Sequence, residues 1–226
     1  MRMNNFFKKE LEKIDPLYSK EYNEILQAYL SVREQTPFWP YCTNENFVEI
    51  MEKTLCKEIK DKKPVTDQIE KITTIAREDW SIEDYESFTS AKNRQKSAQN
   101  EVGLFQQYIL GSCKGWQSSN KGVDLYNEDK NIYLELKNRW NTLNAASRES
   151  TCKKLKKLAD KGYNCYLGYV IPKKESYNRY VETYNINEIC GDKLFELITG
   201  NKNSKDELEF AVNEYFEFKK LKMKNI

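Results

Sequence analysis

The sequence predicts an α/β fold in which a mixed central sheet is flanked by helices and preceded by a helical N-terminal extension. Apolar residues recur at helical spacing through the first half of the chain. After Gly111 they gather instead in short runs typical of strands, in the order strand, strand, helix, strand. With 226 residues and an apolar content of 39%, the chain is large enough to bury a packed core.

The N-terminal half is predicted to be helical. Three stretches have apolar residues at helical spacing: 20–34, 44–60 and 66–78. The breaks between them fall near Pro37, Pro40 and Pro64. Ser81 is a suitable N-cap for a further helical stretch, and residues 93–111 form a helix that ends at Gly111.

The following segment, GVDLYNEDKNIYLELKN, predicts an antiparallel hairpin whose turn covers residues 127–130. A helix at 146–160 ends at Gly162, and the mostly apolar stretch 163–171 is typical of a central strand. Residues 179–184 are predicted to add a strand and residues 205–222 an amphipathic helix. We divide the chain into a helical region, 1–90, packed on a core, 91–226, within one continuous globular unit.

Charge is unevenly distributed although the formal net charge is only +2. Residues 137–180 hold eleven Lys or Arg against three Asp or Glu. Such an excess suits an anionic partner. Taken alone, such a run is more often an exposed helix face, and four of these cations lie on one predicted helix: Lys153, Lys154, Lys156 and Lys157.

Several classes of chemistry are excluded by composition. The chain has no histidine, so Ser-His-Asp and Cys-His nucleophiles and nucleases with a histidine base are ruled out. Its six cysteines form no CxxC pair and predict reduced thiols, not a zinc site. The charged N-terminus does not resemble a signal peptide, and no apolar run is long enough to span a membrane. We expect a soluble cytoplasmic protein.

The hairpin holds the residues best suited to catalysis. Asp124 lies at the end of its first strand, while Glu135 and Lys137 are two residues apart on the second and point to the same face. Leu136 points to the opposite face with Ile132 and Leu134. Two carboxylates brought together in this way can bind a hard divalent cation such as Mg²⁺, with the backbone carbonyl of Leu136 as a further ligand.

This arrangement fits phosphodiester hydrolysis. The cation would neutralise charge on the phosphate and acidify a bound water, and Lys137 would orient or help deprotonate that nucleophile. The alternative is a surface hairpin with ordinary ion pairs, because an Asp followed by an ExK is a loose pattern.

Glu101 is a further catalytic candidate. On the predicted 93–111 helix it shares a stripe with Leu104, Phe105 and Tyr108, the side expected to pack on the sheet. A carboxylate there is best explained by a cation or a hydrogen-bonded site nearby, or else by a partly exposed helix end.

The segments GVDLYN, IYLELKN and NTLNAASRE resemble the core of type II restriction endonucleases of the PD-(D/E)xK superfamily, in particular the family that cuts GGNCC sites. The resemblance covers about residues 95–172. It implies that Asp124, Glu135 and Lys137 are catalytic, that Glu101 assists, and that the fold is the restriction-endonuclease core. The proline that usually precedes the aspartate is replaced by Val123.

Polar residues around the hairpin are candidates for binding DNA, because their donors suit phosphates and base edges. They are Lys121, Asn138, Arg139, Asn141, Thr142, Asn144, Ser147 and Arg148. The alternative for many of them is turn formation and helix capping.

The leading hypothesis is therefore a Mg²⁺-dependent endonuclease that cuts double-stranded DNA, leaves 5′-phosphates and acts as a homodimer beside a cognate DNA methyltransferase. Three alternatives remain. They are a structure-specific repair or junction nuclease, a non-catalytic DNA-binding protein on the same fold, and a helical protein whose acidic N-terminal half binds a partner.

Overall fold

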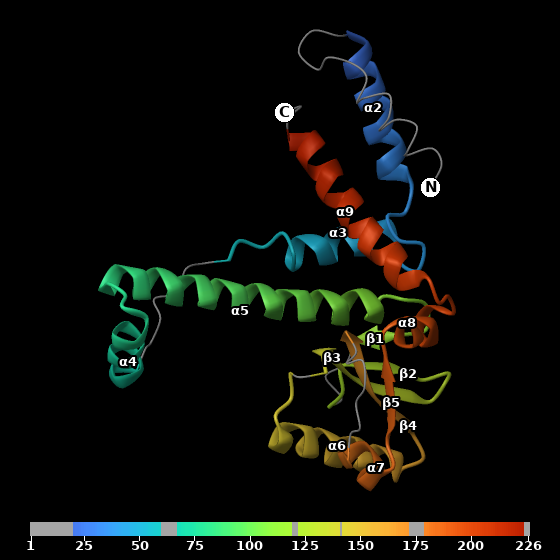
Figure 1. Cartoon of the computed structure of the whole chain (residues 1–226). Helices are drawn as coiled ribbons and strands as arrows, with labels where there is room; N and C mark the ends of the chain where they lie inside the picture. The colour runs from blue at the N-terminus through green and yellow to red at the C-terminus, as the bar shows by residue number, and fades with distance from the viewer. Residues whose placement is uncertain (1–19, 60–66, 119–121, 141, 172–178, 224–226) are drawn as a thin grey trace.

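A five-stranded mixed sheet forms the centre of the computed structural model, with helices on both of its faces (Figure 1). The structure describes residues 20–59, 67–118, 122–140, 142–171 and 179–223. The strands, in sheet order, are β1 (Gln117–Ser118), β2 (Leu125–Asn127), β3 (Ile132–Arg139), β4 (Asn164–Ile171) and β5 (Asn187–Cys190). The pairs β1–β2 and β2–β3 are antiparallel, and β3–β4 and β4–β5 are parallel. The predicted mixed α/β architecture is confirmed.

The described helices follow the order of the chain. They are α2 (Lys20–Gln35), α3 (Asn44–Lys53), α4 (Gln68–Glu78), α5 (Ile82–Gly111), α6 (Ala145–Ala159), α7 (Arg179–Tyr184), α8 (Asp192–Thr199) and α9 (Ser204–Met223). In Figure 1, α5 crosses one side of the sheet and α6 and α7 lie on the other.

Strand alternation in β3 separates two hydrophobic clusters. Leu134 and Leu136 belong to the cluster that includes Phe105 of α5. Tyr133, from the other face of the strand, packs in the cluster that includes Leu155 of α6. Tyr133 therefore faces α6, and alternation places Glu135 on the same side of β3, where Lys154 of α6 reaches it.

Helix α5 is 30 residues long and begins with a capping box formed by Ser81 and Asp84. It ends at Gly111, where a Cβ atom would lie 2.2 Å from Ser118 Oγ, so only glycine allows β1 this close. The predicted cap and the predicted end are confirmed. The helix starts at Ile82, earlier than the predicted residue 93. It therefore runs through residue 90, where we placed the boundary between the helical region and the core, and that division stays a prediction.

The N-terminal helices pack with the C-terminal helix. Trp39 and Phe47 are fully buried in one cluster with Tyr215 and Phe218 of α9. Trp39 Nε1 donates a hydrogen bond of 3.1 Å to the carbonyl of Ser204. In Figure 1, α2 and α9 lie side by side and extend away from the sheet.

Residues 179–184, predicted as a strand, form helix α7 instead. Val181 and Tyr184 both pack on the cluster around α6, and a spacing of three residues places two side chains on one side of a helix but on opposite faces of a strand. The sequence analysis also missed β5 and α8 and extended the 44–60 helix beyond Lys53, where α3 ends.

All six cysteines are free thiols, as predicted. Among the helices of the described residues, none combines the length and apolar character needed to cross a bilayer.

Candidate active site

The β2–β3 hairpin brings Asp124, Glu135 and Lys137 together. Asp124 lies directly before β2, where Leu125 pairs with Leu134 of β3. Extending this antiparallel register by one residue places Asp124 opposite Glu135. The Asp124 Oδ2 atom accepts a hydrogen bond of 2.7 Å from the backbone amide of Leu136. Gln107 of α5 donates to the Asp124 carbonyl at 3.3 Å. Both strand and helix therefore fix this aspartate.

Lys137 bridges the two carboxylates. Its Nζ atom lies 2.8 Å from Glu135 Oε1 and 3.5 Å from Asp124 Oδ2. The side chain of Glu135 is 9% exposed, compared with 27% for Asp124 and 21% for Lys137. The site is therefore partly open on the aspartate side and closed around the glutamate.

Burial and the neighbouring charges perturb the titration of this cluster. Burial and then the negative charge of Glu135 raise the pKa of Asp124 above its usual value. Burial alone would lower the pKa of Lys137, but the charges of Glu135 and Asp124 outweigh it and raise that pKa. Lys137 is consequently an ammonium at neutral pH, suited to donating hydrogen bonds and not to accepting a proton.

The donor set suits a hard divalent cation. Asp124 and Glu135 supply carboxylate oxygens that converge on one cationic group, the Lys137 ammonium. Burial and then the charge of Glu135 raise the pKa of Asp124, and a bound dication would favour its ionised form. Within the described part of the chain, no group of three or more His, Cys, Asp or Glu side chains is placed to hold a metal.

Lys154 is a residue of the site that the sequence analysis missed. It extends from α6 to the sheet, and its Nζ atom lies 2.6 Å from Glu135 Oε2. The basic run 153–157 was visible in the sequence. Nothing in its spacing, however, indicated which lysine would face Glu135, because that depends on how α6 packs across β3.

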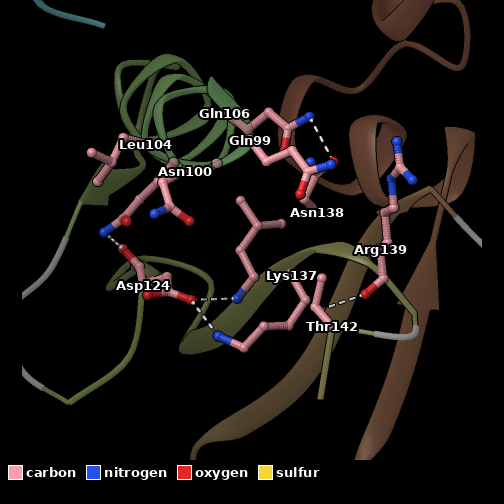
Figure 2. A pocket seen from close by; sticks show the side chains of 12 residues that line it. Gln99, Asn100, Leu104, Gln106, Asp124, Lys137, Asn138, Arg139 and Thr142 are labelled. Carbon is pink, nitrogen blue, oxygen red and sulfur yellow. Dashed lines mark hydrogen bonds and ion pairs between the residues drawn. The ribbon is translucent and has the colours of Figure 1, made fainter. Parts of the chain in front are cut away.

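An open pocket of about 500 Å³ lies beside Asp124 and Lys137, between α5 and the end of β3. In Figure 2, Gln99, Asn100 and Gln106 extend from α5 toward the strand that carries Lys137. Gln106 donates to Asn138 Oδ1 at 3.3 Å, while its own Oε1 atom is buried without a partner.

These α5 amides were not singled out from the sequence either. The pocket-lining residues of α5 are Gln99, Asn100, Gly103, Leu104, Gln106 and Gln107. Their intervals of three, four and seven place them on one face of a helix, so a polar stripe was detectable.

Three of the predicted DNA-binding residues line this pocket: Asn138, Arg139 and Thr142. Arg139 is exposed, and in Figure 2 its guanidinium extends away from Asp124 and Lys137. Thr142 Oγ1 donates to the Arg139 carbonyl at 2.7 Å and so also closes a turn.

Other predicted DNA-binding residues have local structural partners. Asn144 is the N-cap of α6, and its side chain accepts from the Ser147 amide at 2.8 Å. Arg148 donates to the carbonyls of Trp140 and Leu143 at 3.0 and 3.3 Å. Asn144 and Arg148 thus have the helix-capping and turn-forming roles that were the alternative to DNA binding. Lys121 and Asn141 fall outside the described residues.

Glu101 does not line the pocket. Its Oε1 atom lies 3.4 Å from Lys57 Nζ, and its Oε2 atom is buried without a partner. The structure therefore pairs this carboxylate with the segment that follows α3 and not with the Asp124 cluster.

Comparison with known proteins gives consistent matches. The model of the Eco47II restriction endonuclease family matches residues 41–214. The type II restriction enzyme Eco47II of Escherichia coli is 31% identical over 161 residues, which cover 61% of this chain and 66% of that protein. The type II restriction enzyme Sau96I of Staphylococcus aureus is 22% identical over 183 residues, covering 67% and 65%. The chain spans just under two thirds of the length of these two relatives.

Proposed function

Since this chain belongs to the Eco47II restriction endonuclease family, we propose that it is a type II site-specific deoxyribonuclease on a PD-(D/E)xK core. It would hydrolyse phosphodiester bonds of double-stranded DNA with Mg²⁺. The observation that carries the proposal is the hairpin cluster, in which two carboxylates share the Lys137 ammonium at the edge of an open polar pocket.

Asp124 and Glu135 would hold the cation through their carboxylates, with the carbonyl of Leu136 as the backbone ligand. When bound, Mg²⁺ supplies charge neutralisation at the phosphate and lowers the pKa of water. The hydrogen bond from the Leu136 amide keeps Asp124 Oδ2 oriented on the hairpin. This contact also ties the aspartate to the residue whose carbonyl would complete the ligand set.

Lys137 would orient the attacking water and stabilise charge on the phosphate, because its raised pKa keeps it an ammonium. In the reaction the water oxygen bonds to phosphorus and the bond from phosphorus to the 3′ oxygen breaks. The attacking water gives up a proton to the solvent, and the 3′ oxygen takes one up. The products are a 5′-phosphate and a 3′-hydroxyl.

DNA would lie across the pocket. Asn138, Arg139 and Thr142 line it opposite the α5 amides and offer donors to phosphates and base edges. For Lys121, Asn141, Asn144, Ser147 and Arg148, DNA binding stays a prediction. The same holds for catalysis by Glu101, whose pairing with Lys57 gives it no support.

Further parts of the proposal come from the resemblance to the GGNCC-cutting family. We propose GGNCC as the recognition site and a two-fold homodimer as the active form, because two related sites cut the two strands of a near-palindrome. The enzyme would act in the cytoplasm. There a cognate DNA methyltransferase would protect the host DNA.

The test is digestion of methylation-free phage DNA with Mg²⁺, with an EDTA control and sequencing of the fragment ends. We expect discrete fragments whose 5′-phosphorylated ends share one short sequence, and GGNCC at these ends would support the proposed specificity. Cleavage restricted to branched or damaged substrates would favour a repair or junction nuclease instead. DNA binding without cleavage at any Mg²⁺ concentration would favour a non-catalytic protein.

A further inference from the structure

Both oxygens of the Glu135 carboxylate are held by lysines from different elements. Oε1 pairs with Lys137 of the same strand at 2.8 Å, and Oε2 pairs with Lys154 of α6 at 2.6 Å. The Glu135 side chain is 9% exposed, so these ammonium groups replace most of its contact with water. Two donors on two oxygens fix the plane of the carboxylate.

Lys154 is held beside Glu135 by a helix that packs firmly on the sheet. Cys152 and Leu155, close to it in α6, are completely buried against the sheet. Lys153 pairs with Glu149 of α6 and Lys156 with Asp160, the C-cap of this helix, whereas Lys154 reaches across to β3. The ion pair between Lys154 and Glu135 therefore links α6 to β3, unlike the ion pairs that lie along the surface of the helix.

We propose that Lys154 is a positioning residue for Glu135 as a cation ligand. It holds Oε2 on the α6 side. Oε1, which shares the Lys137 ammonium with Asp124, is then the oxygen offered to Mg²⁺. The inference rests on the proposed function. Groups that orient a metal ligand without touching the metal contribute about 10- to 100-fold to metal affinity or activity.

The proposal makes a prediction of definite sign. If Lys154 contributed only a positive charge, it would repel a cation, and its removal would tighten cation binding. If it orients Glu135, its removal weakens cation binding despite the lost repulsion. The two interpretations therefore predict opposite shifts.

The experiment compares the wild type with Lys154→Met, Lys154→Gln and Lys154→Arg. Lys157→Met is the matched control, because Lys157 is an exposed lysine of the same helix. Binding of Mn²⁺ to the chain alone is measured from the free-ion signal in electron paramagnetic resonance. The Mg²⁺ concentration for half-maximal cleavage of phage DNA is measured in parallel. Lys154→Gln also removes the ammonium group and shortens the side chain, so it replaces Lys154→Met, with the same expected result, should that variant not fold.

We expect Lys154→Met to weaken Mn²⁺ binding and to raise the half-maximal Mg²⁺ concentration by about 10- to 100-fold. Lys154→Arg should recover most of the loss, and Lys157→Met should match the wild type. Unchanged or tighter cation binding in a folded Lys154→Met would overturn the inference while the nuclease proposal stands. A wild type that neither binds Mn²⁺ nor cuts DNA would overturn the proposed function and this inference with it. If the wild type binds Mn²⁺ without cutting the DNA, the shift in Mn²⁺ binding tests the role of Lys154. If it cuts DNA without measurable Mn²⁺ binding, the shift in the half-maximal Mg²⁺ concentration tests it.

Discussion

At the residue scale, the Asp124 carboxylate is placed for function at the expense of stability. It is partly buried beside Glu135, and this burial followed by the charge of Glu135 raises its pKa. A carboxyl whose pKa is higher in the folded than in the unfolded state binds its proton more tightly when folded. The ionised form therefore lowers the stability of the metal-free protein at neutral pH.

We predict that Asp124→Asn abolishes cleavage and raises the thermal unfolding midpoint at pH 7 in metal-free buffer. The asparagine oxygen can still accept from the Leu136 amide, while the unfavourable charge is gone. Because the effect needs an ionised Asp124, the gain should disappear as the pH falls below about 4, the ordinary range of an aspartate. Calorimetric scans of both proteins across this pH range provide the check. A lower midpoint for the variant at pH 7 would contradict this account of the site.

At the element scale, the segment between β3 and α6 has to hold the helix that carries Lys154. Asn144 caps α6 and Arg148 binds two carbonyls of the preceding turn. The residue types of this segment suit DNA and helix capping equally well, so composition alone could not separate the two roles. In the structure Asn138, Arg139 and Thr142 line the pocket, while Thr142, Asn144 and Arg148 bond backbone groups. A DNA contact stays a prediction for all of them.

We predict that Asn144→Ala lowers the free energy of unfolding by about 1 kcal/mol, the usual effect of losing an N-cap side chain. Asn144→Ser, which keeps a capping oxygen, should lose much less. Urea unfolding gives the stabilities, and fluorescence anisotropy with duplex DNA in Ca²⁺ gives the affinities. A loss of DNA affinity in Asn144→Ala with unchanged stability would assign Asn144 to DNA contact instead.

The elements that sequence reasoning predicted are those whose signals are local. The hairpin follows from alternation in 132–137, and the limits of α5 follow from Ser81 and Gly111. The helix at 179–184 and the ion pair between Lys154 and Glu135 depend instead on packing against α6. Such contacts join residues distant in sequence, and neither periodicity nor spacing encodes them.

At the scale of the whole molecule, the two ends of the described chain share one core. Trp39 and Phe47 pack with Tyr215 and Phe218, and α5 joins the same cluster through Phe105 to the sheet. The cluster that stabilises the N-terminal helices is thus continuous with the cluster beneath β3. We therefore expect these helices to unfold together with the sheet.

We predict that Trp39→Ala lowers the free energy of unfolding by about 3–5 kcal/mol, because it removes a fully buried ring and leaves the Ser204 carbonyl without its donor. The urea transition should stay single when followed by both circular dichroism and fluorescence. Two separate transitions in the wild type would show that the helical layer is an independent unit.

The central claim is that Lys137, held between Asp124 and Glu135, serves phosphodiester hydrolysis. The most direct measurement is the single-turnover rate of duplex DNA cleavage at saturating Mg²⁺ for the wild type, Lys137→Met and the control Lys157→Met. We predict that Lys137→Met slows cleavage by at least about 100-fold, as expected for loss of a group that stabilises the transition state, while Lys157→Met matches the wild type. Equal rates for Lys137→Met and the wild type would contradict the account.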